Sequence, residues 1–430
     1  MRTAITHGRL IDPRHGIDDE RDLFFADGKV AGIGIAPAGF KADQTVDARG
    51  LIVTPGLVEL SARLREPGSE HKATLDSELR AAVAGGITSL VCPPDTDPPL
   101  DEPGLVEMLK HRARTMNLAH VYPLGALTGK LEGVRLTEMA ELLDAGCIAF
   151  SQADAAIVDT QVLWRAMQYA ATFGFAVWLR PQDPFLSKNG VAHDGEVATR
   201  LGLPGIPAFA ETIALDTMIR LARQTGARTH ICRLSTAESV EMIRQAKAEG
   251  LPITCDVNVH HLHLCDRDIG YFDSQCHVVP PFRTQRDRDA LRAALAEGVI
   301  DALTSDHTPV DDDGKQLPFG ESEPGATGLE LLLPLTLKWA TEAKVPLAQA
   351  LARVTCDPAR VLGLDAGHLG LGAVADVCIF DPARLVTITP QSLKSQGKNS
   401  PFLGYELAGQ VRHTLVAGSV VHAAAKSGSD

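Results

Sequence analysis

Residues 51–94 read LIVTPGLVELSARLREPGSEHKATLDSELRAAVAGGITSLVCPP and contain one complete strand–helix–strand unit. The apolar runs at 51–60 and 86–94 are short and bounded by turn residues, as is typical of strands buried on both faces. Between them, residues 73–86 follow a helical pattern and end in two glycines, which predicts a helix with a C-terminal cap. Two strands joined by a helix indicate parallel pairing.

The same alternation continues to about residue 310. Further strands are predicted at residues 119–127, 146–152, 175–182, 227–235, 252–260 and 299–307. Further helices are predicted at residues 136–146, 159–174, 209–226 and 236–250. The chain therefore offers eight β-α units, and eight parallel strands close a barrel. We predict an α/β fold whose main part is a (β/α)8 TIM barrel.

The two ends of the chain differ from its middle. Both carry short β-like pieces separated by turn residues, such as RDLFFADGKVAGIG at 21–34 and HTLVAGSVVHA at 413–423. We expect both ends to pair into one small composite β-sandwich beside the barrel. The expected division is 1–52 for the first part of the sandwich, 53–365 for the barrel, 366–425 for the second part and 426–430 for a disordered tail.

Composition excludes several classes of protein. The net charge of −13 over 430 residues would repel phosphates and argues against nucleic-acid binding. No apolar run reaches the roughly 20 residues of a membrane span, and the first residues lack the apolar stretch of a signal peptide. Eight scattered cysteines form no C-x-x-C pair, which favours reduced core thiols. We expect a cytoplasmic protein without nucleic-acid or membrane partners.

The active site of such a barrel lies at the C-terminal ends of its strands. In chain order these ends offer Ser61, Arg63 and Arg65, then Asp95, then Gln152, Ala153 and Asp154, then Arg180, Arg233, the histidines His260, His261 and His263, and finally Asp306. Four of these residues, Arg63, Arg65, Arg180 and Arg233, carry permanent positive charges.

These residues do not make a zinc site. Zinc needs three or four converging N, S or O donors. Arginine has no lone pair to donate because its guanidinium stays protonated, so Arg63, Arg180 and Arg233 would repel a cation. With arginines at three of these strand ends, we predict that the protein has no metal cofactor.

Two interpretations of the three arginines stay open. In the first they fill the site, at least one pairs with Asp306, and Glu59, Glu66 or Asp95 balances the others, because a buried unpaired carboxylate is costly. In the second they form a pocket for a carboxylate or phosphate, which arginine clusters suit equally well.

Nearly the whole chain resembles a dihydroorotase of the amidohydrolase superfamily. The resemblance rests on long motifs in the right order, including GITSLVCPPDTDPP at 86–99, TGARTHICRLSTAESVEMIRQAKAEG at 225–250 and TSDHTP at 304–309. It implies a (β/α)8 barrel with a composite β-sandwich. It also implies zinc-dependent, reversible cyclisation of carbamoyl aspartate to dihydroorotate.

The resemblance fails at the metal site. The family carries an H-x-H pair on its first strand, an acid after the fourth, and histidines at the ends of the fifth and sixth. Here these positions hold Ser61 and Arg63, Gln152 and Ala153, Arg180, and Arg233. Only the aspartate of the eighth strand remains, as Asp306. Of the substrate-binding groups, Arg65 is retained and Asp95 replaces an asparagine, so both are vestigial.

This pattern resembles the inactive dihydroorotase-like chains that accompany bacterial aspartate transcarbamoylase. The implied role is that of a non-catalytic structural subunit in pyrimidine biosynthesis, with the transcarbamoylase catalytic subunit as partner and a homodimer or higher oligomer as its own state. The alternative is an active dihydroorotase or related cyclic amidohydrolase with diverged metal ligands. A sensor of a pathway metabolite is compatible with the first role.

The histidines receive structural interpretations. The family has a pair of histidines in the segment that here contains His260, His261 and His263, and the resemblance implies that this pair lies outside the first metal shell. We expect these histidines to be hydrogen-bonded near the rim of the pocket. Weak binding of a transition metal there stays open. We expect His230 to be packed within its strand and His307 to point away from the preceding aspartate, since strand neighbours alternate.

Overall fold

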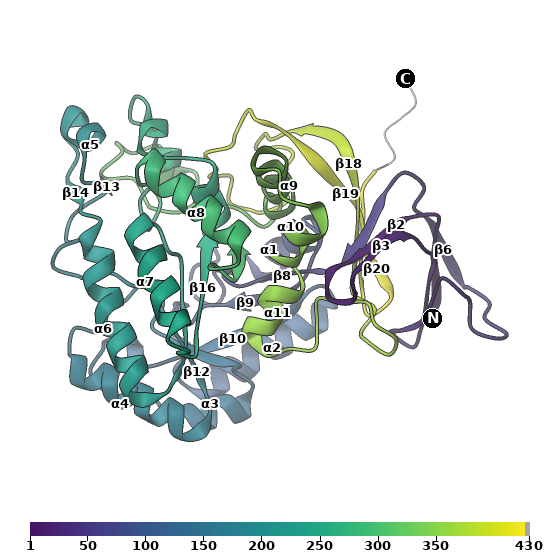
Figure 1. Ribbon diagram of the computed structural model, residues 1–430, viewed down its shortest axis with the longest axis horizontal. Helices are drawn as coiled ribbons and strands as arrows, with labels where there is room; N and C mark the ends of the chain where they lie inside the picture. Colours follow the sequence, from purple (N-terminus) through teal and green to yellow (C-terminus); the bar gives the residue numbers. More distant parts are fainter. Residues whose placement is uncertain (426–430) are drawn as a thin grey trace.

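A computed structural model describes residues 1–425 and contains the predicted barrel (Figure 1). Its eight parallel strands form one nearly closed sheet, in the order in which they follow one another along the chain. They are β8 (Leu57–Glu59), β9 (Ile87–Cys92), β10 (His120–Ala126), β11 (Ala149–Ser151), β12 (Ala176–Leu179), β15 (Arg228–Ile231), β16 (Ile253–Asn258) and β17 (Ala302–Thr304). The expected tail at 426–430 lies outside the described residues.

The barrel closes between its first and last strands by a few backbone contacts. Ala62 and His307 form a parallel bridge just beyond the ends of β8 and β17. There the Ser61 carbonyl accepts the His307 N–H at 3.0 Å, and the His307 carbonyl accepts the Arg63 N–H at 2.9 Å. The seam is therefore fixed at the C-terminal ends of the strands, beside the candidate site.

Helices cover the outside of the barrel (Figure 1). They are α1 (Leu75–Ala84), α2 (Pro103–Met116), α3 (Met139–Ala145), α4 (Thr160–Phe173), α5 (Glu196–Leu201), α6 (Phe209–Thr225), α7 (Ala237–Ala248), α8 (Gln285–Glu297), α9 (Leu332–Ala343), α10 (Leu347–Ala352) and α11 (Cys356–Leu362). Left-handed glycines end α3, α4 and α6, as the sequence predicts. Across residues 1–425, no helix is long and apolar enough to cross a membrane.

Both chain ends build two further sheets beside the barrel, where the purple and yellow strands of Figure 1 meet. One has the order β20-β19-β18-β7-β2-β3 and the other β5-β4-β1-β6. Their strands are β1 (Arg2–Thr6), β2 (Arg9–Asp12), β3 (Ile17–Glu20), β4 (Leu23–Ala26), β5 (Lys29–Ile33), β6 (Gln44–Asp47), β7 (Ile52–Pro55), β18 (Val377–Thr387), β19 (Glu406–Val416) and β20 (Ser419–Ala423). Ile5, Phe25 and Val53 from one end share a core with Leu415 from the other.

The structure corrects the first predicted strand, because residues 51–60 divide at Gly56. β7 pairs with β18 in the sandwich, whereas β8 begins the barrel. The Gly56 N–H donates to the Asp376 carbonyl at 2.9 Å, and a Cβ at Gly56 would lie 2.1 Å from the Thr88 Oγ1 atom. Thr88 thus leaves no room for a side chain where the chain passes from one layer to the next.

A side chain at Gly56 should destabilise the protein. We expect Gly56→Ala to lower the free energy of unfolding by about 1–3 kcal/mol, as overpacking does elsewhere. Urea unfolding followed by circular dichroism measures the change. Gly104→Ala is the matched control, because no atom lies within 4 Å of the Cβ position there. Equal stability of the two variants would contradict the steric interpretation.

Candidate functional site

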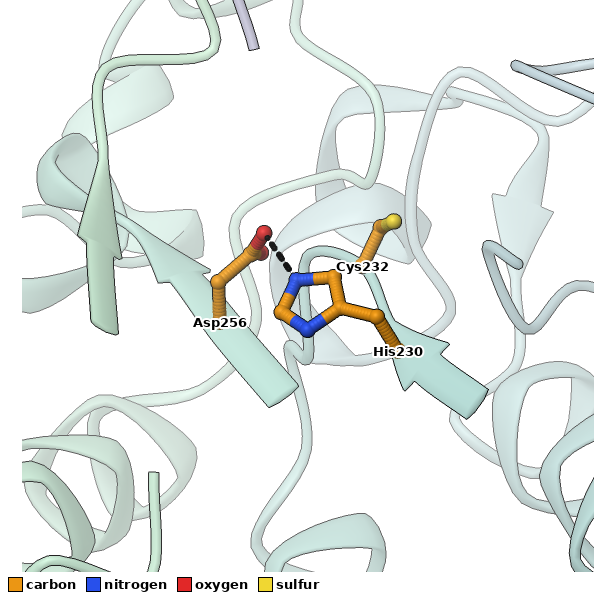
Figure 2. Close-up of side chains that lie close together, drawn as sticks. All are labelled: His230, Cys232 and Asp256. Atoms are coloured by element: carbon orange, nitrogen blue, oxygen red, sulfur yellow. Dashed lines mark hydrogen bonds and ion pairs between the residues drawn. The ribbon is translucent and has the colours of Figure 1, made fainter. Parts of the chain in front are cut away.

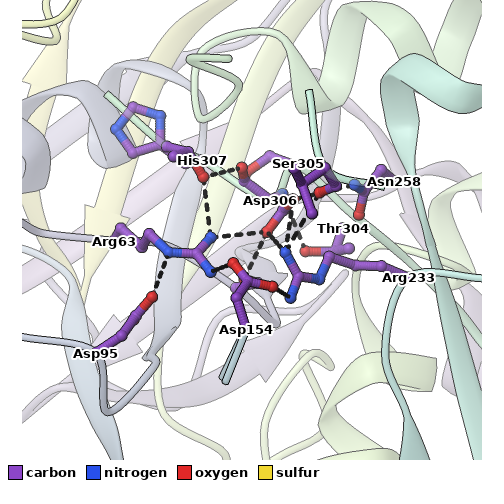
Figure 3. A network of polar contacts seen from close by, with 12 residues as sticks. Arg63, Asp95, Asp154, Arg233, Asn258, Thr304, Ser305, Asp306 and His307 are labelled. Atoms are coloured by element: carbon purple, nitrogen blue, oxygen red, sulfur yellow. Dashed lines mark hydrogen bonds and ion pairs between the residues drawn. The ribbon is translucent and has the colours of Figure 1, made fainter. Parts of the chain in front are cut away.

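Three arginines and three aspartates meet at the C-terminal ends of the barrel strands. Figure 3 shows Arg63 and Arg233 with the three aspartates. The members of this ion cluster are Arg63, Arg180, Arg233, Asp95, Asp154 and Asp306. Their formal charges cancel. The three arginine side chains are only 5–6 % exposed, so the charges are balanced inside the protein rather than by solvent.

Arg63 has the most side-chain partners of the three arginines. Its Nε donates to the Asp95 Oδ2 atom at 2.7 Å, and its Nη2 donates to the Asp154 Oδ2 atom at 2.6 Å. Its Nη1 reaches the Asp306 Oδ1 atom at 3.1 Å and the Thr308 Oγ1 atom at 2.9 Å. The guanidinium thus bridges three carboxylates, whose charges raise its pKa well above the usual value against the effect of burial.

Asp154 collects all three arginines. Arg233 donates to its Oδ1 atom, and the Arg180 Nε atom lies 2.5 Å from the same oxygen. Burial alone would raise the pKa of Asp154, but the charges of Arg233, Arg180 and Arg63 outweigh it and hold that pKa well below its usual range. The side chain is 38 % exposed, so it forms the solvent side of the cluster.

Asp306 forms the floor of the cluster. Arg233 donates to both of its carboxylate oxygens at 3.3 Å. The Ser61 hydroxyl donates to Oδ1 and the Asn258 amide to Oδ2, each at 3.0 Å. The backbone of Asp306 has φ = 45°, a left-handed conformation it shares with Arg233, at φ = 59°. Such strained residues at strand ends are typical of functional sites.

Not every expected residue joins the cluster. Gln152 turns away and exchanges hydrogen bonds of 2.8 and 3.1 Å with the Thr128 hydroxyl, and Ala153 offers no functional group. Of the three acids offered as counter-charges, Asp95 takes this role and pairs with Arg63, whereas Glu59 and Glu66 bind elsewhere. Glu59 accepts backbone N–H groups at the barrel seam, and Glu66 caps α1 and pairs with an arginine of α2.

The counter-charge that sequence reasoning missed is Asp154. It follows the fourth strand in the segment FSQAD, two residues after the expected position of the acidic ligand. Its acidic side chain at a strand end was the signal that could have found it. Only the structure shows that the loop after β11 places the Asp154 carboxylate against all three arginines.

The comparisons with known proteins agree with this barrel. The dihydro-orotase-like family model matches residues 50–239, and the amidohydrolase family model matches residues 191–421. A dihydroorotase-like protein of Pseudomonas aeruginosa is 46 % identical over 98 % of this chain and 100 % of its own length.

The chain belongs to the dihydroorotase-like family of amidohydrolases. A dihydroorotase of Geobacter sp. is 39 % identical over 99 % of this chain and 100 % of its own length. Among solved structures, the L-hydantoinase of Arthrobacter aurescens has a TM-score of 0.87 at 25 % identity, covering 97 % of this chain and 95 % of its own. The dihydropyrimidinase of Brevibacillus agri has a TM-score of 0.82 at 20 % identity, with 98 % and 95 % covered, which shows the fold alone.

The residues at the family's metal positions do not fit a zinc ion in this dihydroorotase-like chain. Ser61 offers a neutral hydroxyl that already donates to Asp306. Arg63, Arg180 and Arg233 have no lone pair and carry positive charge. A divalent cation here would lie among three guanidinium groups with one carboxylate as its main ligand, far short of the donors that zinc requires.

Within residues 1–425, one group of side chains has the ligand types and the spacing that could hold a metal ion. It consists of His230, Cys232 and Asp256 (Figure 2). Their donor atoms lie within 4.8 Å of one another. The His230 Nε2 atom lies 2.9 Å from the Asp256 carboxylate, and its Nδ1 atom lies 2.8 Å from the Thr254 hydroxyl. Asp256 also accepts the Arg233 N–H at 2.6 Å. An ion would have to displace these hydrogen bonds.

Arg65, the retained substrate-binding residue of the family, lies beside the cluster. Its Nε donates to the Pro309 carbonyl at 2.9 Å. Burial and the positive charge of Arg63 lower its pKa. Asp95, the other residue that the resemblance predicts to be a vestige of substrate binding, pairs with Arg63 at 2.7 Å.

The histidines after β16 are packed. His260 and His261 are 4 % and 2 % exposed, and the His261 Nε2 atom lies 3.3 Å from the Pro281 carbonyl. The His263 Nε2 atom lies 2.9 Å from the Leu335 carbonyl. Burial lowers the pKa of His260 to about 3, that of His263 to about 4, and that of His261 well below its usual range. His307 points away from the cluster and contacts Glu78 at 2.6 Å.

These three histidines should make the protein sensitive to acid. Below about pH 6.5 these histidines bind protons in the unfolded chain, whereas in the folded chain they stay neutral. The free energy of unfolding therefore falls as the pH drops towards 4. The expected slope is at most about 1.4 kcal/mol per pH unit for each of His260, His261 and His263, or about 4 kcal/mol together.

Urea unfolding at several pH values between 7 and 4.5 measures this slope. The control is the triple variant His260→Gln/His261→Gln/His263→Gln, whose stability should depend less on pH. The difference between the two proteins cancels groups of opposite sign, such as Glu59, whose pKa burial raises to about 7. Parallel stability curves would contradict the prediction.

Proposed function

We propose that this chain is a non-catalytic dihydroorotase homologue that serves as a structural subunit of an aspartate transcarbamoylase complex in pyrimidine biosynthesis. The observation that carries the non-catalytic role is the ion cluster, in which Arg63 and Arg233 bind Asp306 at the family's metal positions. The proposed partner rests on the resemblance of the chain to inactive dihydroorotases.

The chemistry of the family explains why such a cluster would end catalysis. A bound zinc ion lowers the pKa of water and polarises the carbonyl that is attacked. A guanidinium group stabilises an anion, but it cannot hold and activate a hydroxide as a metal ion does. The carboxylate that would receive the metal, Asp306, is instead neutralised by two arginines and held by Ser61 and Asn258.

Metal analysis combined with an activity assay tests this part of the proposal. The protein is purified with zinc in all buffers, dialysed, and analysed for zinc by mass spectrometry. The cyclisation of carbamoyl aspartate and the reverse hydrolysis are then followed with added zinc. We expect far less than one zinc per chain and no turnover above the uncatalysed rate. Stoichiometric zinc with turnover would establish the alternative, an active amidohydrolase with diverged ligands.

Co-expression tests the partner. The chain is produced with and without the aspartate transcarbamoylase catalytic chain of the same organism, and mass is measured by light scattering after gel filtration. We expect a larger assembly in the mixture, altered carbamoyl-transfer activity, and a homodimer or higher oligomer of the chain alone. Masses in the mixture equal to those of the separate proteins would remove the structural role.

A further inference from the structure

A cavity of about 140 Å³ lies between α4 and α6, on the helix side of the barrel wall. Its apolar lining is contributed by the loop after β11, the end of β12 and the two helices. The main apolar residues are Ile157, Leu163, Leu179, Ile213, Ala214 and Met218. Leu179 belongs to the core shared with the helices, and the cavity borders the ion cluster at Arg180, which belongs to both.

Two charged residues line the cavity, and each keeps unused hydrogen-bonding capacity: the Oδ2 atom of Asp183 and N–H groups of Arg180. The Asp183 Oδ1 atom accepts the backbone N–H groups of Phe185 and Leu186, each at 2.9 Å. Arg180 has five N–H groups. Within residues 1–425, its Nη1 donates to Gln182, its Nη2 donates to the Asp154 carbonyl, and its Nε faces the Asp154 carboxylate as an ion pair without hydrogen-bond geometry. Two donors of a side chain that is 94 % buried are therefore left.

Arg180 has fewer carboxylate partners than the other two arginines of the cluster. It shares Asp154 with Arg233 and Arg63, whereas each of those arginines has further contact with Asp306. Burial, and then the charge of Arg233, lower the pKa of Arg180 although Asp154 opposes them. An added negative charge near this guanidinium would therefore be favourable.

We propose that this cavity binds a small carboxylate whose apolar body has about the size of one benzene ring. The ring would lie among Leu163, Ile213 and Met218, and the carboxylate would take the two remaining N–H groups of Arg180. The size follows from the volume, since an apolar cavity of roughly 150 Å³ accommodates benzene. The paired guanidinium donors favour a carboxylate over a neutral polar group. The site is independent of the proposed structural role.

Methyl NMR tests the proposal on the full chain. Seven methionines provide resolved probes, and Met218→Leu assigns the one in the cavity. Benzoate, acetate and benzyl alcohol are titrated separately. We expect benzoate to shift the Met218 signal saturably in the millimolar range, and the two partial ligands to need at least tenfold higher concentration. Equal binding of benzyl alcohol would overturn the role of Arg180, and no saturation by benzoate would overturn the site.

Variants separate this cavity from other surfaces. Ala214→Phe fills the cavity and should weaken benzoate binding at least tenfold. Gln224→Phe places the same side chain at an exposed position of the same helix and should leave binding unchanged. If Ala214→Phe does not fold, Met218→Ala enlarges the cavity and should favour 2-naphthoate over benzoate, detected by calorimetry. Benzoate affinity that is unchanged in Ala214→Phe, or no gain for 2-naphthoate in Met218→Ala, would overturn the assignment.

Discussion

Asp306→Asn should lower the free energy of unfolding by about 3–5 kcal/mol, the range observed when one partner of a buried ion pair is removed. The carboxylate is 5 % exposed and faces both Arg63 and Arg233. Asparagine has the same shape and tolerates the left-handed backbone at φ = 45°, so the substitution removes charge and little else. The three guanidinium groups of the cluster would then share only Asp154 and Asp95.

Equilibrium unfolding in urea measures this loss. The matched control is Asp216→Asn, which removes the carboxylate of an exposed ion pair with Arg220 on α6 and should leave stability unchanged. The triple variant Arg63→Met/Arg233→Met/Asp306→Asn removes two of the three buried cations together with Asp306. It leaves Arg180 paired with Asp154 and the partly exposed Asp95 without its arginine, so it should recover part of the loss. A triple variant less stable than Asp306→Asn would contradict the electrostatic explanation.

The second large effect is expected from restoring lone-pair donors. We predict that Ser61→His/Arg63→His/Arg180→His/Arg233→His, with Asp306 unchanged, binds about one zinc ion per chain. Four imidazoles and one carboxylate exceed the three or four donors that zinc requires, and the three permanent cations are gone. Mass spectrometry of dialysed protein and competition with a chromophoric chelator measure the binding.

The control replaces the same four positions by glutamine, which removes the cations without supplying imidazole donors. It should remain at the zinc content of the unchanged protein, which also corrects for any ion held by His230, Cys232 and Asp256. If the glutamine and histidine variants bind equal zinc, the arginines do not decide whether the barrel takes up metal.

The sequence alone predicts much of the architecture because period and residue type are local properties. Eight alternations of apolar runs and amphipathic segments indicate the barrel, and glycines mark the ends of helices such as α4 and α6. The sequence also predicts the loss of metal ligands where arginine replaces them, because a guanidinium has no lone pair to donate in any fold. The motifs at the strand ends resemble those of the dihydroorotase family, and this resemblance indicates where the candidate site lies.

Other features depend on contacts between distant segments, which no local pattern contains. The division of residues 51–60 at Gly56 follows from Thr88 in the next barrel strand. Which acid neutralises which arginine follows from where loops end in space. Asp154 lies 91 residues from Arg63 and 79 from Arg233 along the chain, whereas the nearer Glu59 and Glu66 face other partners. Sequence determined that the site is cationic, and only tertiary structure decided how it is neutralised, because electrostatic energy depends on distance through space and not along the chain.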